Sequence, residues 1–472
     1  MDSLYADHAV QQRLAEFLGG DSLVDASALY ITRSDGCQFQ RSELLPLAQL
    51  PLLLHQGRDI ARSLADHRAL LLHLDVEYVH FDQPAAAFLH PQRAFALQEP
   101  AVHAIQSLLL ACGIAPLHLL TGQGHHFVWQ IDAASPVAAR IAALNPAPEL
   151  VDACQRRLGP NPALAVSRPQ QTTFASLALL MEFLAHLIKR TAAPASTLPI
   201  EITAVLRPPA PTGQRELVSI DISEYGDPLQ TRMVRMPFTH YLKPWATGLA
   251  QKLGIEPLLK PIVAIPLHEM DVSQALRCRQ NQAEVHQLAR RAPTRIPFQE
   301  KGTARLLDAY LLSPLRRFHQ HFYSALHDPP EQWPHTYHQT PLAALPPCAR
   351  LLLQQPNDRL LKPVGIQLIC RVLLAHGWHP RHIAGLIRSK FENPQHGWGV
   401  NWQDYEAGTR ADFYTRLFLG QWATGTDHLA DFSCAAIQGA DFCPLPLSSP
   451  SPACSLDPLP NLPNLPNLSP LP

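Results

Sequence analysis

The chain has 472 residues, 46% of them hydrophobic, and a formal net charge of −1. This length predicts two or three domains with real cores. Proteins that bind duplex DNA through contacts with many phosphates usually carry a more positive net charge than this chain, so composition alone does not indicate nucleic-acid binding. The sequence contains no uncharged apolar run long enough for a membrane helix, and its start, MDSLYADHAVQQRLAEF, is unlike a secretory signal. A cytoplasmic protein without a membrane partner is therefore expected.

Up to about residue 245 the pattern mixes strands with helices. Apolar or alternating runs predict strands at Ala69–Phe81, Pro116–Leu120, His125–Ile131, Ile200–Leu206 and Leu217–Ile222. Amphipathic runs predict helices at Gln11–Leu18, Arg93–Cys112 and Thr173–Arg190. The glycines of the TGQG sequence between the second and third strands predict a turn, because glycine readily adopts positive φ.

Beyond Trp245 the character of the sequence changes. Residues 250–335 are rich in Arg and Gln and lack strand alternation, which predicts a helical connector. A helical domain is expected from Pro341, with its clearest helices at Leu360–His376 and His379–Phe391. The sequence after Cys443 is proline- and serine-rich with an LPNLPNLPNL repeat, which predicts an extended, mobile tail.

Two acidic residues, Asp75 and Glu77, lie two positions apart in the first predicted strand. Their side chains should therefore project from the same face. Burying two carboxylates together costs stability unless something neutralises them, and hard divalent cations bind carboxylate oxygens well. Considered alone, the pair fits a solvated strand end better than a metal site.

A glycine turn followed by histidine is the second motif, T-G-Q-G-H-H from Thr121 to His126. At Gly122 and Gly124 the backbone N–H groups could approach phosphate oxygens, and His126 could reach the same phosphates. A simple hairpin turn fits these residues at least as well.

An aspartate followed by cations is the third motif. Asp221 ends a predicted strand, and Arg232, Arg235 and Lys243 follow within about two dozen residues. A carboxylate that completes a metal site, followed by cations, suits the binding of a metal–triphosphate. Considered alone, a charged and solvated hairpin also fits this stretch.

In this order, the three motifs resemble the archaeo-eukaryotic primase superfamily over roughly residues 65–245. The family carries an acidic pair, a small-residue turn ending in histidine, and an aspartate followed by an R-x-P-x-S-x-x-x-K-like stretch, matched here by RMPFTHYLK from Arg235 to Lys243. Gln123 and Tyr241 depart from the family pattern, which commonly has arginine at the first position and in some members histidine at the second.

The resemblance implies an α+β, RRM-like catalytic domain with a mixed or antiparallel sheet. It further implies that Asp75, Glu77 and Asp221 hold two Mg²⁺ or Mn²⁺ ions. The implied nucleotide-binding residues are Thr121, Gly122, Gly124, His126, Arg235 and Lys243.

Four of the nine cysteines form a spaced set, consisting of Cys348, Cys434, Cys443 and Cys454. Four thiolates can hold zinc or an iron–sulfur cluster, although buried free thiols account for the spacing as well. The odd cysteine count argues against a disulfide framework.

The region around these cysteines resembles the iron–sulfur domain of the primase large subunit. The shared features are Pro346–Cys348, Thr409–Arg416 (TRADFYTR) and Ser433–Cys434. This second resemblance implies a [4Fe-4S] cluster on the four cysteines, in a domain that helps to bind template and initiating nucleotide. Arg410 and Arg416, with Tyr414 between them, suit single-stranded nucleic acid, and a packed surface helix is nearly as good an interpretation.

Together these features predict a catalytic domain over 1–245, a connector over 246–335, an iron–sulfur domain over 336–456 and a tail over 457–472. The expected activity is primer synthesis on single-stranded DNA from NTPs or dNTPs, with a helicase or other replication proteins as further partners. The alternatives are a non-templated nucleotidyltransferase or nuclease, and a nucleic-acid-binding protein with a decayed site.

Overall fold

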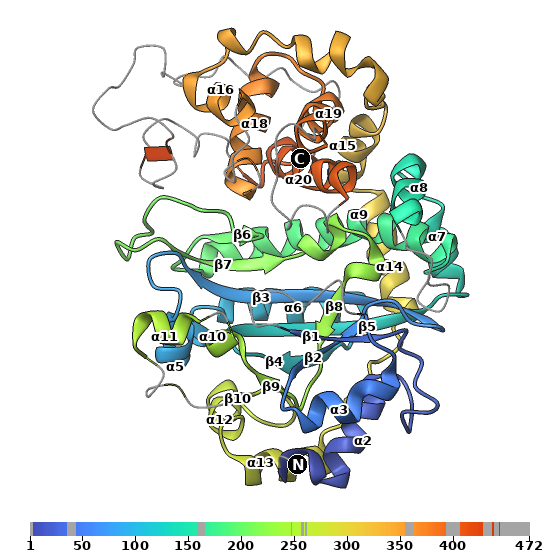
Figure 1. The fold of residues 1–472 in the computed structure, drawn as a ribbon, viewed down its shortest axis with the longest axis vertical. Helices are drawn as coiled ribbons and strands as arrows, with labels where there is room; N and C mark the ends of the chain where they lie inside the picture. Colours follow the sequence, from blue (N-terminus) through green and yellow to red (C-terminus); the bar gives the residue numbers. More distant parts are fainter. Residues whose placement is uncertain are drawn as a thin grey trace.

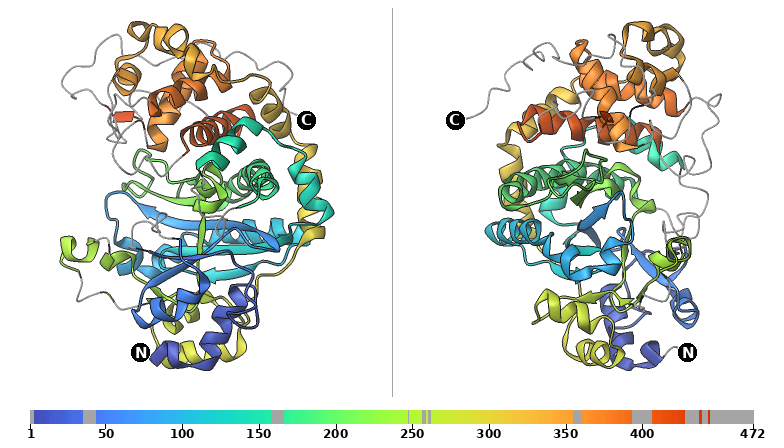
Figure 2. Two further views of the ribbon diagram at one scale, coloured as in Figure 1. Left: turned by 45° about the vertical axis from the view of Figure 1, so that its right-hand side comes forward. Right: turned by 90° about the vertical axis from the view of Figure 1, so that its left-hand side faces the viewer.

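The computed structural model describes residues 3–34, 44–157, 166–246, 248–255, 259, 262–354, 360, 362–392, 406–427, 437–438 and 443. These residues form an α+β structure with mixed and antiparallel sheets (Figure 1). A helical layer lies at one end, the main sheet in the middle, and α2 (His8–Phe17) and α13 (Gln282–Arg291) pack together at the other end. The turned views show the same order of layers (Figure 2).

The central element is a six-stranded sheet. Its strands, in spatial order, are β11 (Ile265–Pro266), β4 (Leu117–Leu120), β5 (Gly124–Asp132), β3 (Ala69–His80), β7 (Glu216–Asp221) and β6 (Ile200–Ile202). All neighbours are antiparallel except β6 and β7, which are parallel. The long strand β3 lies between β5 and β7, so it is a central strand of the sheet.

Two smaller sheets accompany the main sheet. One consists of β1 (Ile31–Ser34), β2 (Asp59–Ser63) and β8 (Met233–Arg235), and the other pairs β9 (His240–Tyr241) with β10 (Ile262–Val263). The strands β8 and β9 come soon after β7 in sequence, so the cationic segment after Asp221 is built into these small sheets.

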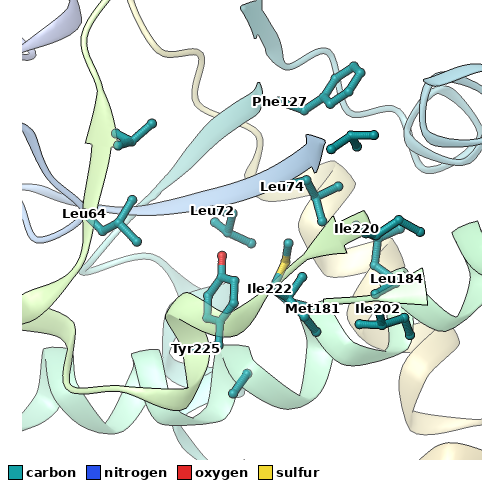
Figure 3. Packing of buried hydrophobic residues seen from close by; sticks show 14 of the residues in the cluster. Leu64, Leu72, Leu74, Phe127, Met181, Leu184, Ile202, Ile220, Ile222 and Tyr225 are labelled. Carbon is teal, nitrogen blue, oxygen red and sulfur yellow. The ribbon is translucent and has the colours of Figure 1, made fainter. Parts of the chain in front are cut away.

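The core lies between the main sheet and the long helix α9 (Arg168–Ala192) (Figure 3). Leu72 and Leu74 of β3 and Ile220 of β7 point toward Met181 and Leu184 of α9, and all five are buried. Burying each such side chain contributes about 1.5–3 kcal/mol. The helical stretch Arg168–Ala195 is apolar and long enough to cross a membrane by length and composition, but 83% of its apolar window is buried, as expected for a core helix.

Shorter helices surround this core. Before α9 they are α1 (Ser3–Ala6), α3 (Leu50–His55), α4 (Ala86–Leu89), α5 (Pro91–Ala96), α6 (Glu99–Cys112), α7 (Pro136–Ala142) and α8 (Pro148–Arg157). After β9 they are α10 (Lys243–Ala246), α11 (Leu249–Leu253), α12 (Val272–Cys278) and α14 (Glu300–Leu311). The predicted helix Arg93–Cys112 is divided into α5 and α6, and α6 ends as expected at Gly113, which adopts a positive φ of 73°.

The helical layer contains α15 (Pro314–Phe322), α16 (Pro347–Gln354), α18 (Pro363–Ala375), α19 (Pro380–Phe391) and α20 (Ala407–Ala423). The central helix α20 contacts α15, α18 and α19. The arginines that suggested nucleic-acid binding are turned inward. Arg416 Nε lies 2.8 Å from Glu182 Oε2 of α9, and Arg410 Nη1 lies 3.2 Å from Asp227 Oδ2. The packed-helix interpretation therefore describes these two side chains.

The segment expected as a connector is part of several layers. β10 and β11 each pair with a strand from before residue 245, and α13 packs on α2. The sequence did not predict β10 and β11 because strands of two residues are too short to show alternation. Only from α14 onward does the chain cross toward the helical layer, where α15 packs on α20. The predicted tail, residues 457–472, lies outside the described residues.

Candidate functional site

The register of the main sheet brings the three sequence motifs together. Asp75 on β3 lies directly opposite His126 on β5 and opposite Asp221 on β7. Residues directly opposite in antiparallel strands project from the same face. Asp75, His126 and Asp221 therefore form one row across three neighbouring strands, although 146 residues separate the first from the last.

Glu77 extends this row on the same face of β3. It lies opposite Gly124 on one side and Ser219 on the other. Asp75 and Glu77 are half-buried, whereas the alternate residues Leu74 and Val76 are buried on the opposite face. The predicted pair thus lies on one face of β3, as its spacing required, and that face remains partly open.

A second acid–histidine pair lies beside the first, and the motifs did not point to it. His73 Nδ1 is 2.9 Å from Glu224 Oε1, and His126 Nε2 is 3.4 Å from Asp75 Oδ1. The two histidine rings meet edge to face with centroids 4.6 Å apart. The available signal was the alternation His73–Asp75–Glu77, which places His73 on the acidic face.

Burial and charge shift the protonation of these groups. Burial, reinforced by the Asp221 charge, raises the pKa of Asp75 to about 7 although His73 and Lys243 oppose this shift. Burial also raises the pKa of Glu77 against the opposing charge of Lys243. The carboxylates therefore hold protons more tightly than exposed carboxylates do, because their charges are poorly solvated.

The two histidines are shifted in opposite directions. Burial, together with the nearby His73 and Arg235 charges, holds the pKa of His126 well below 6.5, which favours a neutral ring. Burial also acts to lower the pKa of His73, but the carboxylates of Glu224, Asp75 and Asp221 together outweigh it and raise the pKa, which favours the imidazolium. The two shifts thus favour a neutral ring at His126 and a protonated ring at His73.

The cations of the third motif lie beside the acidic row and already have partners. Arg235 Nε on β8 is 3.2 Å from Asp59 Oδ1, and its guanidinium lies over the Tyr241 ring at 4.2 Å from the centroid. At the start of α10, burial acts to lower the pKa of Lys243, but Glu77, Tyr241 and Asp75 together outweigh it and raise the pKa.

The glycine turn packs beneath β9 and is buried. A Cβ atom at Gly122 would overlap the Tyr241 ring, and one at Gly124 would overlap the Val76 carbonyl oxygen. Thr121 is also buried, and its carbonyl accepts a hydrogen bond from Arg279. The glycines are therefore required by close packing, and the turn sets where β5 begins and so where His126 lies.

The two departures from the family pattern contact each other. Tyr241 Oη donates a hydrogen bond to Gln123 Oε1 at 3.1 Å. This hydrogen bond between two uncharged side chains links β9 to the glycine turn.

Several buried polar atoms in the site have no hydrogen-bond partner among the described residues, including Ser219 Oγ, His73 Nε2 and His126 Nδ1, and Asp75 Oδ1 has only the longer 3.4 Å contact with His126. One oxygen of Asp221, Oδ1, accepts a hydrogen bond from Ser223 N at 2.8 Å. Oxygen donors of this kind fit a hard divalent cation. As the side chains stand, however, no three His, Cys, Asp or Glu residues within the described part of the chain are arranged to hold one ion.

The four-cysteine set is only partly described. Cys348 is buried in the first turn of α16, and Cys443 is half-buried against the core. Cys434 and Cys454 lie outside the described residues. The structure therefore does not test whether the four thiols surround one cluster.

The chain was compared with protein-family models, with curated proteins and with solved structures, and no match was found in any of the three.

Proposed function

We propose that the protein is a template-dependent primase or polymerase that joins nucleoside triphosphates on single-stranded DNA. The observation that carries the proposal is the in-register row of Asp75, Asp221 and His126, extended by Glu77. The resemblance of the motifs to those of the archaeo-eukaryotic primases requires these residues to lie together in one site. The α+β fold, with a largely antiparallel sheet backed by α9, is compatible with the RRM-like domain of that family.

In this proposal the carboxylates of Asp75, Glu77 and Asp221 would hold Mg²⁺ or Mn²⁺. Such ions activate the attacking 3′-hydroxyl and stabilise the leaving pyrophosphate. The neutral His126 and the cationic Lys243 and Arg235 would contact the triphosphate. Thr121, Gly122 and Gly124 would act mainly by placing His126, since the turn itself is buried.

The test is primer synthesis and extension on single-stranded DNA with Mg²⁺ or Mn²⁺, comparing wild type with Asp75→Ala. The matched control is Asp132→Asn, an exposed carboxylate six positions from His126 on β5. We expect template-dependent products from wild type and the control, and at least a hundredfold loss for Asp75→Ala, since metal-held charge accounts for several kcal/mol of barrier lowering. Undiminished synthesis by Asp75→Ala would refute the assignment.

The same assay separates the alternatives. Products that form equally well without template indicate a non-templated nucleotidyltransferase, and shortened DNA indicates a nuclease. Binding of DNA without any chemistry, together with an unchanged result for Asp75→Ala, indicates a decayed site.

We also propose that Cys348, Cys434, Cys443 and Cys454 bind a [4Fe-4S] cluster, on the strength of the second resemblance. Anaerobic purification should yield a coloured protein with a broad visible absorption band that Cys434→Ser removes. A colourless protein with stoichiometric zinc would contradict the cluster and leave the polymerase proposal intact.

A further inference from the structure

We infer, resting on the proposed function, that α20 of the helical layer positions the metal-binding carboxylates through the short 3₁₀ turn η4 (Ser223–Gly226). Arg410 and Phe413 are then positioning residues for a site that they do not enter. The helical layer would then affect metal binding at the site, in addition to helping to bind template.

On its sheet side, η4 contacts Asp221 directly and contacts β3 at His73, two residues before Asp75. Ser223 N donates to Asp221 Oδ1 at 2.8 Å. The pair Asp75–Asp221 is the last in the β3–β7 ladder, so within the described part of the chain no strand pairs with His73 on this side of β3. The Tyr225 side chain points toward β3 (Figure 3). Its hydroxyl accepts a hydrogen bond from His73 N at 3.0 Å and donates one to His73 O at 3.3 Å, in place of a strand.

The side chain of Glu224 adds a third bond to the same residue of β3, since its Oε1 lies 2.9 Å from His73 Nδ1. All three bonds reach β3 two residues before Asp75, two of them at the His73 backbone and one at its side chain. The η4 turn thus ties together the strand ends that carry the two carboxylates, and it does so with buried groups, whose hydrogen bonds are costly to leave unmade.

On its other side, η4 is covered by α20. Gly226 has no side chain, and a Cβ atom there would lie 2.8 Å from the Phe413 ring, so Phe413 packs directly on the turn. Arg410 Nη1 lies 3.2 Å from both carboxylate oxygens of Asp227, the buried residue that follows η4. Asp227 also pairs with Arg232, which donates to Ser223 O at 3.2 Å.

These contacts form a continuous path from α20 through η4 to the carboxylate row. If docking of α20 favours the arrangement that binds metal, metal binding must strengthen docking of α20 by the same factor. Removal of Arg410 leaves η4 with one fewer anchor while every metal-binding carboxylate remains in place.

The first experiment is a titration with Mn²⁺, following the free ion by electron paramagnetic resonance. We expect Arg410→Ala to bind Mn²⁺ about two- to thirtyfold more weakly than wild type, the range typical of residues that couple two sites. Arg410→Lys should recover part of the loss because it keeps the charge. The control, Arg140→Ala, removes an arginine from a surface pair with Asp308 and should bind like wild type.

The second experiment measures amide hydrogen exchange of α20 with and without Mn²⁺. In wild type, Mn²⁺ should slow exchange over residues 407–423, and this protection should be smaller in Arg410→Ala. A helix that merely binds template would show unchanged Mn²⁺ affinity and a raised KM for template in Arg410→Ala, and that result would overturn the inference.

Failure of the inference is separable from failure of the proposed function. If wild type binds Mn²⁺ and makes templated products while Arg410→Ala matches it in Mn²⁺ affinity, only the inference is wrong. If wild type neither binds Mn²⁺ nor makes products, the proposed function is wrong and the inference fails with it.

Discussion

Replacing Asp75 by asparagine should stabilise the metal-free protein while abolishing its activity. In the folded state the carboxyl of Asp75 keeps its proton up to about pH 7, because its pKa is raised from 3.8 to about 7. The unfolded chain loses this proton near pH 4. Between these values the unfolded state binds fewer protons, so stability falls as the pH rises through the window.

The magnitude follows from the two pKa values. The difference between 3.8 and about 7 corresponds to about 4 kcal/mol of stability lost above pH 7. The side chain is 19% exposed, so solvent screens part of this charge and the figure is an upper limit. Asparagine keeps the shape of the side chain and cannot ionise. Relative to wild type, Asp75→Asn should therefore gain most of this lost stability at pH 8, and less than half of it at pH 5.

The assay is urea unfolding in the presence of EDTA at pH 5 and pH 8. Asp132→Asn is the control, since its side chain is exposed and the change should cost little at either pH. Adding Mn²⁺ should stabilise wild type and not Asp75→Asn, because a cation offsets the buried charges only where the ligand remains. A stability gain that is absent at pH 8, or equal at both pH values, would refute the reasoning.

Two further changes test the fold that supports the site. Gly124→Ala should lower stability by at least the roughly 1–3 kcal/mol typical of an overpacked core. The reason is that its Cβ would overlap the Val76 carbonyl oxygen, which belongs to the backbone and cannot easily move. The measurement is the Tm, and an unchanged Tm would mean that β5 does not approach β3 so closely. Asp66→Ala should cost about 3–5 kcal/mol in urea unfolding, because it leaves the fully buried Arg62 without its partner at 2.8 Å. Asp152→Ala, which removes an exposed pair with Arg168, should cost under about 1 kcal/mol, and equal losses for the two would contradict the role of burial.

Local patterns in the sequence determined the strands and helices that carry the site. Period-two alternation predicted β3 and placed Asp75 and Glu77 on one face, and the glycine turn before His126 was correctly placed between β4 and β5. The first prediction succeeded because side-chain direction along a strand depends only on nearby residues. The turn lies where it was predicted, but the stated reason was wrong, because Gly122 and Gly124 do not adopt positive φ and are required by close packing instead.

Sequence order suggested that Asp75, His126 and Asp221 converge, but only through resemblance to a family. The strand register that places the three in one row depends on pairing between segments up to 146 residues apart. Register follows from which faces are buried across the whole sheet, and no single segment contains that information.

Only the tertiary structure decided which charged residues are paired with one another. Arg410 and Arg416, with Tyr414 between them, suited single-stranded nucleic acid by residue type, yet they pair with Asp227 and Glu182 across the interface between α20 and the sheet layer. Arg235 is likewise held by Asp59, 176 residues away. A charged side chain looks the same in sequence whether it faces solvent or an opposite charge, because burial is set by the long-range packing of other elements.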